Sequence, residues 1–105
     1  MAKAEINAGA CGFKTVVITQ MEEGMSKISI QSDCKAIQRL GEALTEVNPY
    51  QEITFRREGP LTLLMAAQYC SHTACPVPSG IIKAVEVEAG LNLPVDVSIK
   101  LSKSE

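Results

Sequence analysis

The chain has 105 residues, of which 46% are hydrophobic and 21% charged, with a formal net charge of −2 at pH 7. This length fits one globular domain that can bury its own core. The chain has only two Phe and two Tyr and no Trp, and its ten basic residues are scattered. The composition therefore excludes the basic face and the aromatic stacking platforms of a nucleic-acid binder.

The first residues, MAKAEINAGACGF, contain no apolar stretch of the kind that marks a signal peptide. No run in the chain approaches the roughly 18 apolar residues of a membrane span. We therefore expect a cytoplasmic protein that does not bind a membrane. The reducing cytosol disfavours structural disulfides, so the four cysteines of this chain point to a metal, redox or catalytic role.

The first predicted elements are a possible short strand at AEINAG and a β-hairpin at KTVVITQMEEGMSKISIQS. Two runs rich in Val, Ile, Thr and Ser flank EEG, and Gly24 can take the positive φ that a hairpin turn requires. A two-residue turn at Glu23-Gly24 is possible, but we prefer a three-residue turn that ends at Gly24. That register pairs apolar residues of both strands on one face, namely Val16 and Ile18 with Ile30 and Ile28.

Three helices are predicted after the hairpin. The first lies in SDCKAIQRLGEALTEVNP and ends at Asn48-Pro49. The second, PLTLLMAAQYC, starts at Pro60 and is apolar nearly all round, which predicts deep burial. The third, PSGIIKAVEVEAG, has a proline near its start and Gly90 just past its end. The first helix is recognised by apolar residues at helical spacing: Ile37, Leu40, Leu44 and Val47.

The segment PVDVSIKLS, residues 94–102, has the clearest strand pattern, because apolar and polar residues alternate along it. QEITFRREG fits either a short strand or an extended connection. The order of elements predicts one α+β domain over residues 1–105. We expect a small, mostly antiparallel sheet, formed by the N-terminal hairpin and the C-terminal strand, with about three helices on one face.

Each of the four cysteines falls in a predicted loop or at a helix end. Either hairpin register puts Cys11 and Cys34 at the same open end, as near cross-strand neighbours about 5–8 Å apart. Cys70 closes the second helix, and the SHTA loop folds it back towards Cys75. Cys34 and Cys75 also begin helices, whose free amides and dipole stabilise a thiolate. The sequence therefore allows two local thiol pairs that form one four-thiolate site.

Several chemistries fit these thiols. Cysteine can be a small buried hydrophobe, and two disulfides are another alternative. Structural zinc sites often contain two short Cys-x2–4-Cys knuckles, and this chain has one, Cys70 to Cys75. Iron–sulfur clusters, such as the 4Fe–4S type, also take four thiolates, and a ligand cysteine before proline, as in ACPVP, occurs in ferredoxins. We favour the cluster, with His72 as an alternative ligand, spaced His-x2-Cys from Cys75.

Two resemblances add to this interpretation. CPVPSGIIKAV resembles the Cys-Pro-x-Pro motif that opens a helix in TusA-like sulfur-carrier proteins. That resemblance implies that Cys75 carries a persulfide that is handed between partner proteins. The whole chain resembles a family of short, uncharacterised four-cysteine proteins of anaerobic bacteria and archaea, marked by ACGF, SDC and CPVP. The second resemblance implies a shared cysteine site.

The sequence therefore predicts a small cytoplasmic protein that binds an iron–sulfur cluster through Cys11, Cys34, Cys70 and Cys75. The cluster would serve electron transfer, or cluster or metal delivery to a partner protein. The alternatives are a TusA-like persulfide carrier with Cys75 as acceptor and a structural zinc site. No acid–base pair, serine triad or phosphate loop is visible, so no enzymatic activity is predicted.

Overall fold

The computed structural model describes residues 1–104, which form an antiparallel four-stranded sheet and four helices. The α+β class and the N-terminal hairpin are confirmed. No helix in this range is long and apolar enough to cross a membrane. Along the chain the elements are β1 (Ala2–Asn7), β2 (Lys14–Glu22), β3 (Met25–Ser32), α1 (Lys35–Ala43), β4 (Glu46–Val47), α2 (Pro49–Glu52), α3 (Leu61–Tyr69) and α4 (Val77–Glu88).

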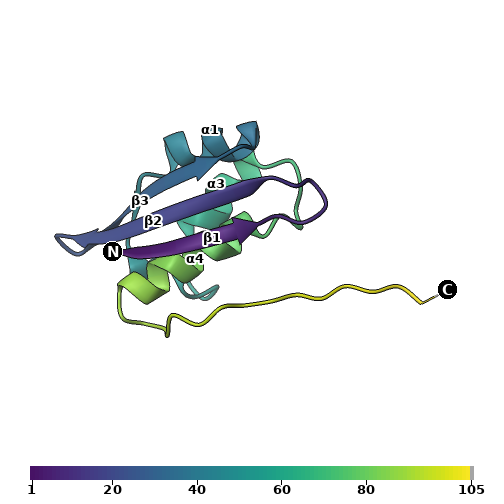
Figure 1. Ribbon diagram of the computed structural model, residues 1–105. Helices are drawn as coiled ribbons and strands as arrows, with labels where there is room; N and C mark the ends of the chain where they lie inside the picture. Colours follow the sequence, from purple (N-terminus) through teal and green to yellow (C-terminus); the bar gives the residue numbers. More distant parts are fainter. Residues whose placement is uncertain (105) are drawn as a thin grey trace.

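The strands lie in the order β1-β2-β3-β4, and the helices cover one face of the sheet (Figure 1). Helix α1 packs on β3, α4 packs on β1 and β2, and α3 contacts α1 and α4. The core lies between these layers, where apolar side chains of the sheet meet those of α1 and α4. Its fully or almost fully buried members include Val17, Leu40, Leu44, Ile81 and Val85.

The hairpin register differs by one residue from the one we preferred. Its turn contains only Glu23 and Gly24, with φ of 51° and 82°. Positive φ at both central residues matches the twist of the flanking strands, so the two-residue turn is favoured. As a result Val17 pairs with Ile30, where we expected Val16. The predicted three-residue turn was therefore wrong.

Buried hydroxyl groups explain why the apolar pattern misled the prediction. The face of β2 that meets the helices carries Thr15, Val17 and Thr19, all buried. The Thr19 hydroxyl donates to the Ala84 carbonyl of α4 (3.0 Å), and the Thr15 and Ser32 hydroxyls are hydrogen-bonded to each other (2.8 Å). Because these polar groups have partners, burying threonine costs little, and the more apolar face of β2 points outward.

The first helix is shorter than predicted. Helix α1 ends at Ala43, and the next residues turn back to the edge of β3, where the Thr45 carbonyl accepts the Ile28 N–H (2.9 Å). Val47 is buried as expected, but it lies in β4, paired with Ser26. Sheet pairing therefore replaced the last predicted turn of helix. The ambiguous segment QEITFRREG continues α2 and then runs as a loop.

Helix α3 forms where the sequence predicted it, but the predicted deep burial was wrong. Only Thr62 and Ala66 are buried in this helix, and Leu64 is 57% exposed. The helix lies on α1 and α4 and leaves its outer side to solvent. Its start is fixed by the buried Glu52 carboxylate, which accepts the Leu61 N–H (2.8 Å) and the Thr62 N–H and hydroxyl (2.9 and 2.6 Å).

Helix α4 is attached to the sheet at both of its ends. Near its start it approaches β1 so closely that a Cβ at Gly80 would overlap the Ile6 side chain. At its end the Glu88 carboxylate accepts the Met21 N–H (2.9 Å) and forms an ion pair with the Met1 ammonium group (3.3 Å). These contacts fix the direction of α4 along β1 and β2.

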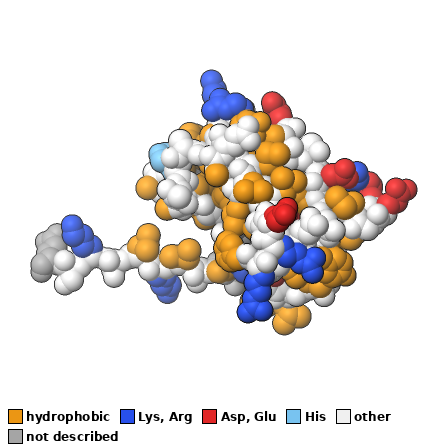
Figure 2. Space-filling view, turned by 180° about the vertical axis from the view of Figure 1, so that it is seen from behind, with side chains coloured by type: hydrophobic (Ala, Val, Ile, Leu, Met, Phe, Trp, Pro, Cys, Tyr) orange, Lys and Arg blue, Asp and Glu red, His pale blue; other side chains and the backbone are white. Residues whose placement is uncertain are grey.

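The predicted C-terminal strand does not join the sheet. Residues 93–104 are extended and project from the body of the molecule (Figures 1 and 2). The sheet therefore ends at β1, and the part of the prediction that included this segment was wrong. The apolar side chains of the segment are 63–90% exposed: Val95, Val97, Ile99 and Leu101.

Candidate four-cysteine site

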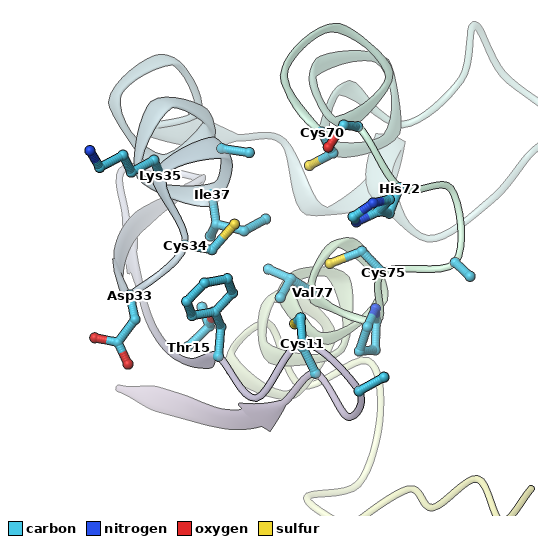
Figure 3. Close-up of a pocket in the computed structure, with 17 residues that line it drawn as sticks. Cys11, Thr15, Asp33, Cys34, Lys35, Ile37, Cys70, His72, Cys75 and Val77 are labelled. Atoms are coloured by element: carbon cyan, nitrogen blue, oxygen red, sulfur yellow. The ribbon is translucent and has the colours of Figure 1, made fainter.

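All four cysteines line one cavity of about 680 Å³, a volume within the usual range for small-molecule and cofactor sites. The cavity lies at the end of the sheet where β1 leads into β2 and β3 leads into α1. Figure 3 shows the four cysteine side chains around it. They come from four separate segments: the β1–β2 loop, the start of α1, the end of α3 and the loop before α4.

Cys11 lies in the β1–β2 loop and is exposed. A tight turn places it there, because the Gly12 N–H donates to the Gly9 carbonyl (2.8 Å), and the Ala8 N–H donates to the Phe13 carbonyl (3.1 Å). Gly9 and Gly12 have φ angles of 88° and 75°, which residues other than glycine rarely adopt. The flanking glycines thus form the turn that presents Cys11.

Cys34 is the N-cap residue of α1 and is half-buried. Its N–H donates to the Ser32 hydroxyl (3.1 Å), and its carbonyl accepts the Gln38 N–H (2.9 Å). The end of the hairpin and the start of the helix therefore both position it. Cys11 and Cys34 do lie at the same end of the hairpin, as either register required.

Cys70 and Cys75 are the two ends of a short loop and are both half-buried. Cys70 caps the end of α3 through its N–H, which donates to the Ala66 carbonyl (2.8 Å). The Cys75 N–H donates to the His72 carbonyl (3.2 Å), and α4 begins two residues later. His72 is exposed and lies between the two cysteines at the cavity wall (Figure 3).

The Cys70 thiol is harder to ionise than a free thiol. Partial burial raises its pKa, and the neighbouring sulfurs of Cys75 and Cys34 raise it further. The second effect arises because a negative charge on either neighbouring sulfur would repel a negative charge on Cys70. A bound cation would reverse this balance, because it stabilises each thiolate directly.

The remaining cavity wall is mainly apolar, and sequence reasoning missed it. Asp33 and Lys35 stand at the rim with their side chains directed away from the cavity (Figure 3). Ile37 was predicted to be buried, and Phe13 appeared in the sequence analysis only as part of the ACGF motif, with no role of its own. The apolar members of the wall are Ala8, Ala10, Phe13, Ala36, Ile37, Ala74, Pro76 and Val77.

The structure thus brings together the two thiol pairs that the sequence could only place separately. All four cysteines are free thiols. Within residues 1–104, no three His, Cys, Asp or Glu side chains are close enough together to ligate a single metal ion. The four thiols line one cavity together with His72.

Comparison with known proteins identifies a family. No curated protein and no solved structure matches this chain. A family model does match, over residues 2–101, a range that contains all four cysteines. This agrees with the expected membership of an uncharacterised family. The chain belongs to the family of unknown function DUF6951.

Proposed function

We propose that this protein binds an iron–sulfur cluster through Cys11, Cys34, Cys70 and Cys75, in the cytoplasm, and transfers electrons or delivers the cluster to a partner protein. The observation that carries the proposal is the convergence of four free thiols from four segments on one cavity. Cysteine thiolates are the usual ligands of such clusters, and a bound cluster supplies one-electron redox chemistry.

The four thiols line a cavity, and no three ligands in residues 1–104 gather for one ion, which supports a cluster over a single ion. Four sulfurs around one zinc ion, each at a Zn–S distance of 2.3 Å, lie about 3.8 Å from one another. A 4Fe–4S cluster gives each thiolate its own iron, so its ligands stand farther apart. The cavity of about 680 Å³ also suits a group larger than one ion.

The other residues of the site would affect the redox potential, the accessibility and the pH dependence of the bound cluster. Phe13, Ile37 and Val77 give the cavity apolar walls, which limit solvent access and so affect a redox potential. Cys11 is exposed, so the cluster would lie near the surface, where a partner protein can approach it. Loading requires that Cys70 lose its proton, so we expect binding to release protons and to weaken as the pH falls.

The test is purification without oxygen, followed by analysis of metal and of inorganic sulfide. We expect a brown protein with a broad visible absorption band and about four iron and four sulfide ions per chain. Serine substitution of each cysteine, one at a time, should lower both contents. His72→Ala is the matched control, because it removes a cavity-lining donor that the proposal does not use.

Two other results would each replace this proposal. A colourless protein with one zinc ion per chain, unfolded by chelators, would establish a structural zinc site. A colourless protein that gains one labile sulfur atom on Cys75, and keeps it when the other cysteines are replaced, would establish a sulfur carrier. The position of Cys75 two residues before the start of α4 favours this second candidate over zinc.

A further inference from the structure

The C-terminal segment has the pattern of a β-strand but no partner strand in its own chain. Val95, Val97, Ile99 and Leu101 form one apolar side, and Asp96, Ser98 and Lys100 lie between them. The apolar side is largely exposed, whereas such a side is normally buried in a sheet. We propose that residues 95–101 pair with the free edge of β1 in a second copy of this chain, forming a strand-exchanged dimer.

The exit from α4 directs the segment away from its own sheet. The Gly90 and Leu91 N–H groups donate to the carbonyls of Val87 and Glu86 (3.1 and 2.9 Å), with Gly90 at φ 74°. This is the Schellman arrangement that ends many helices. The Asn92 side chain adds a hydrogen bond to the Glu86 carboxylate (2.9 Å). The start of the segment is therefore fixed in direction, and Figures 1 and 2 both show it leaving the body.

The edge of β1 offers unpaired backbone groups to such a strand. Within residues 1–104, β1 pairs with β2 alone. The bond from the Ala8 N–H to the Phe13 carbonyl sets the alternation of the antiparallel ladder. By that alternation, the N–H and C=O groups of Lys3, Glu5 and Asn7 point away from β2. An exposed edge of this kind is a template for a further strand.

The two surfaces match in length and in character. The seven residues 95–101 can lie along the six residues of β1. Their apolar side chains would extend the inner face of β1, which carries Ala2, Ala4 and Ile6. On the polar face, a parallel pairing can place Asp96 beside Lys3, and an antiparallel one Lys100 beside Glu5. Two copies that exchange this segment bury both unpaired surfaces and form a closed two-fold dimer.

The first test is the mass of the full chain in solution, by sedimentation equilibrium over a range of concentrations. We expect a dimer for the native chain and a monomer for the double variant Val97→Asp/Ile99→Asp. The matched control, Ser98→Asp/Ser102→Asp, adds the same charge to the polar side and should remain a dimer. All variants should stay folded, as circular dichroism would show, because the segment lies outside the core.

A mixing experiment separates exchange from other forms of association. Glu5→Pro removes one outward N–H of β1 without breaking a bond to β2, so this variant alone should be a monomer. Mixing it with Val97→Asp/Ile99→Asp should restore a dimer, because one chain supplies the segment and the other supplies the edge. A monomeric native chain, a dimeric Glu5→Pro chain or no dimer on mixing would each overturn the proposal.

This proposal is independent of the cysteine site. Serine substitution of the cysteines should leave the dimer intact, so failure of one proposal does not imply failure of the other. If the native chain is a monomer whose residues 95–101 are protected from hydrogen exchange, the segment pairs with its own β1, and the dimer is excluded.

Discussion

The two ends of the sheet are held together in different ways. At the end near the hairpin turn, Glu88 joins the end of α4 to two strands. It contacts Met1, which directly precedes β1, and Met21, near the end of β2. At the cysteine end, the hydrogen bonds are local. Among residues 1–104, none joins the loop of Cys11 to the loop that carries Cys70 and Cys75. The protein's own polar groups complete the first end, whereas the second leaves four thiols that a bound group could link.

The largest expected effect tests whether both ends depend on the same core. Leu40 is fully buried, so Leu40→Ala should lower the free energy of unfolding by about 2–5 kcal/mol. Denaturant unfolding, with hydrogen exchange measured at both ends, should show one cooperative transition. The control Leu64→Ala makes the same chemical change at an exposed position and should cost about 0.5 kcal/mol or less. Loss of protection at only one end would contradict a shared core.

The next effect concerns the anchor of α3, the helix that ends at Cys70. Glu52→Ala leaves the Leu61 and Thr62 donors without an acceptor and should cost about 1–3 kcal/mol. Alkylation of Cys70 should also become faster, because the helix that holds it is loosened. Glu52→Gln keeps one acceptor oxygen and should lose less stability. Unchanged reactivity of Cys70 would show that the anchor does not extend to the cysteine end.

A smaller effect is expected at the turn end, and it should depend on pH. The Met21 N–H and the Met1 ammonium group lower the pKa of Glu88. Its ionised form therefore stabilises the fold above the ordinary carboxyl pKa of about 4.3, and this contribution is lost as the pH falls through the lower folded value. Glu88→Gln should melt slightly below the native chain at pH 7, with the gap closing in acid. Thermal melts across this range provide the test, and a constant gap would argue against the ion pair.

The smallest effect is expected at Cys70 in metal-free protein. Its raised pKa means that the folded state favours the neutral thiol. The neutral thiol therefore contributes its full stabilisation of the fold below the ordinary thiol pKa of about 8.5. This stabilisation is lost as the pH rises through the raised pKa of Cys70 in the folded state. Melting temperatures of the native chain should therefore fall more steeply in alkali than those of Cys70→Ala. An equal slope for the two chains would argue against a raised pKa at Cys70.

Local signals predicted the elements of this fold well. Gly24 in the turn, Pro60 at the start of α3 and Gly90 after α4 all act within a few residues, and each lies where the sequence placed it. The errors arose where a distant partner decides. Thr19 is buried because the Ala84 carbonyl accepts its hydroxyl, and Val47 pairs with a strand about twenty residues earlier. Neither partner can be recognised from neighbouring residues.

The candidate site divides in the same way. A hairpin necessarily returns to its starting end, so the common position of Cys11 and Cys34 followed from the sequence. The approach of Cys70 and Cys75 to that end depends on how α3 and α4 pack on the rest of the molecule. That packing is a long-range property. The inclusion of Phe13 in the wall follows from this packing too, so the ACGF motif contained the residue without revealing its role.

Gly80 does not line the cavity, but it determines how closely α4 approaches β1. Because residue 80 has no side chain, α4 lies directly against Ile6 of β1. Cys75 precedes the start of this helix, and the loop of Cys11 follows the end of β1, so the spacing between helix and strand also determines the spacing between these two thiols. A larger residue at position 80 would force the Ile6 side chain or the start of α4 to move. Position 80 can therefore alter the shape of this cavity without a change to any residue that lines it.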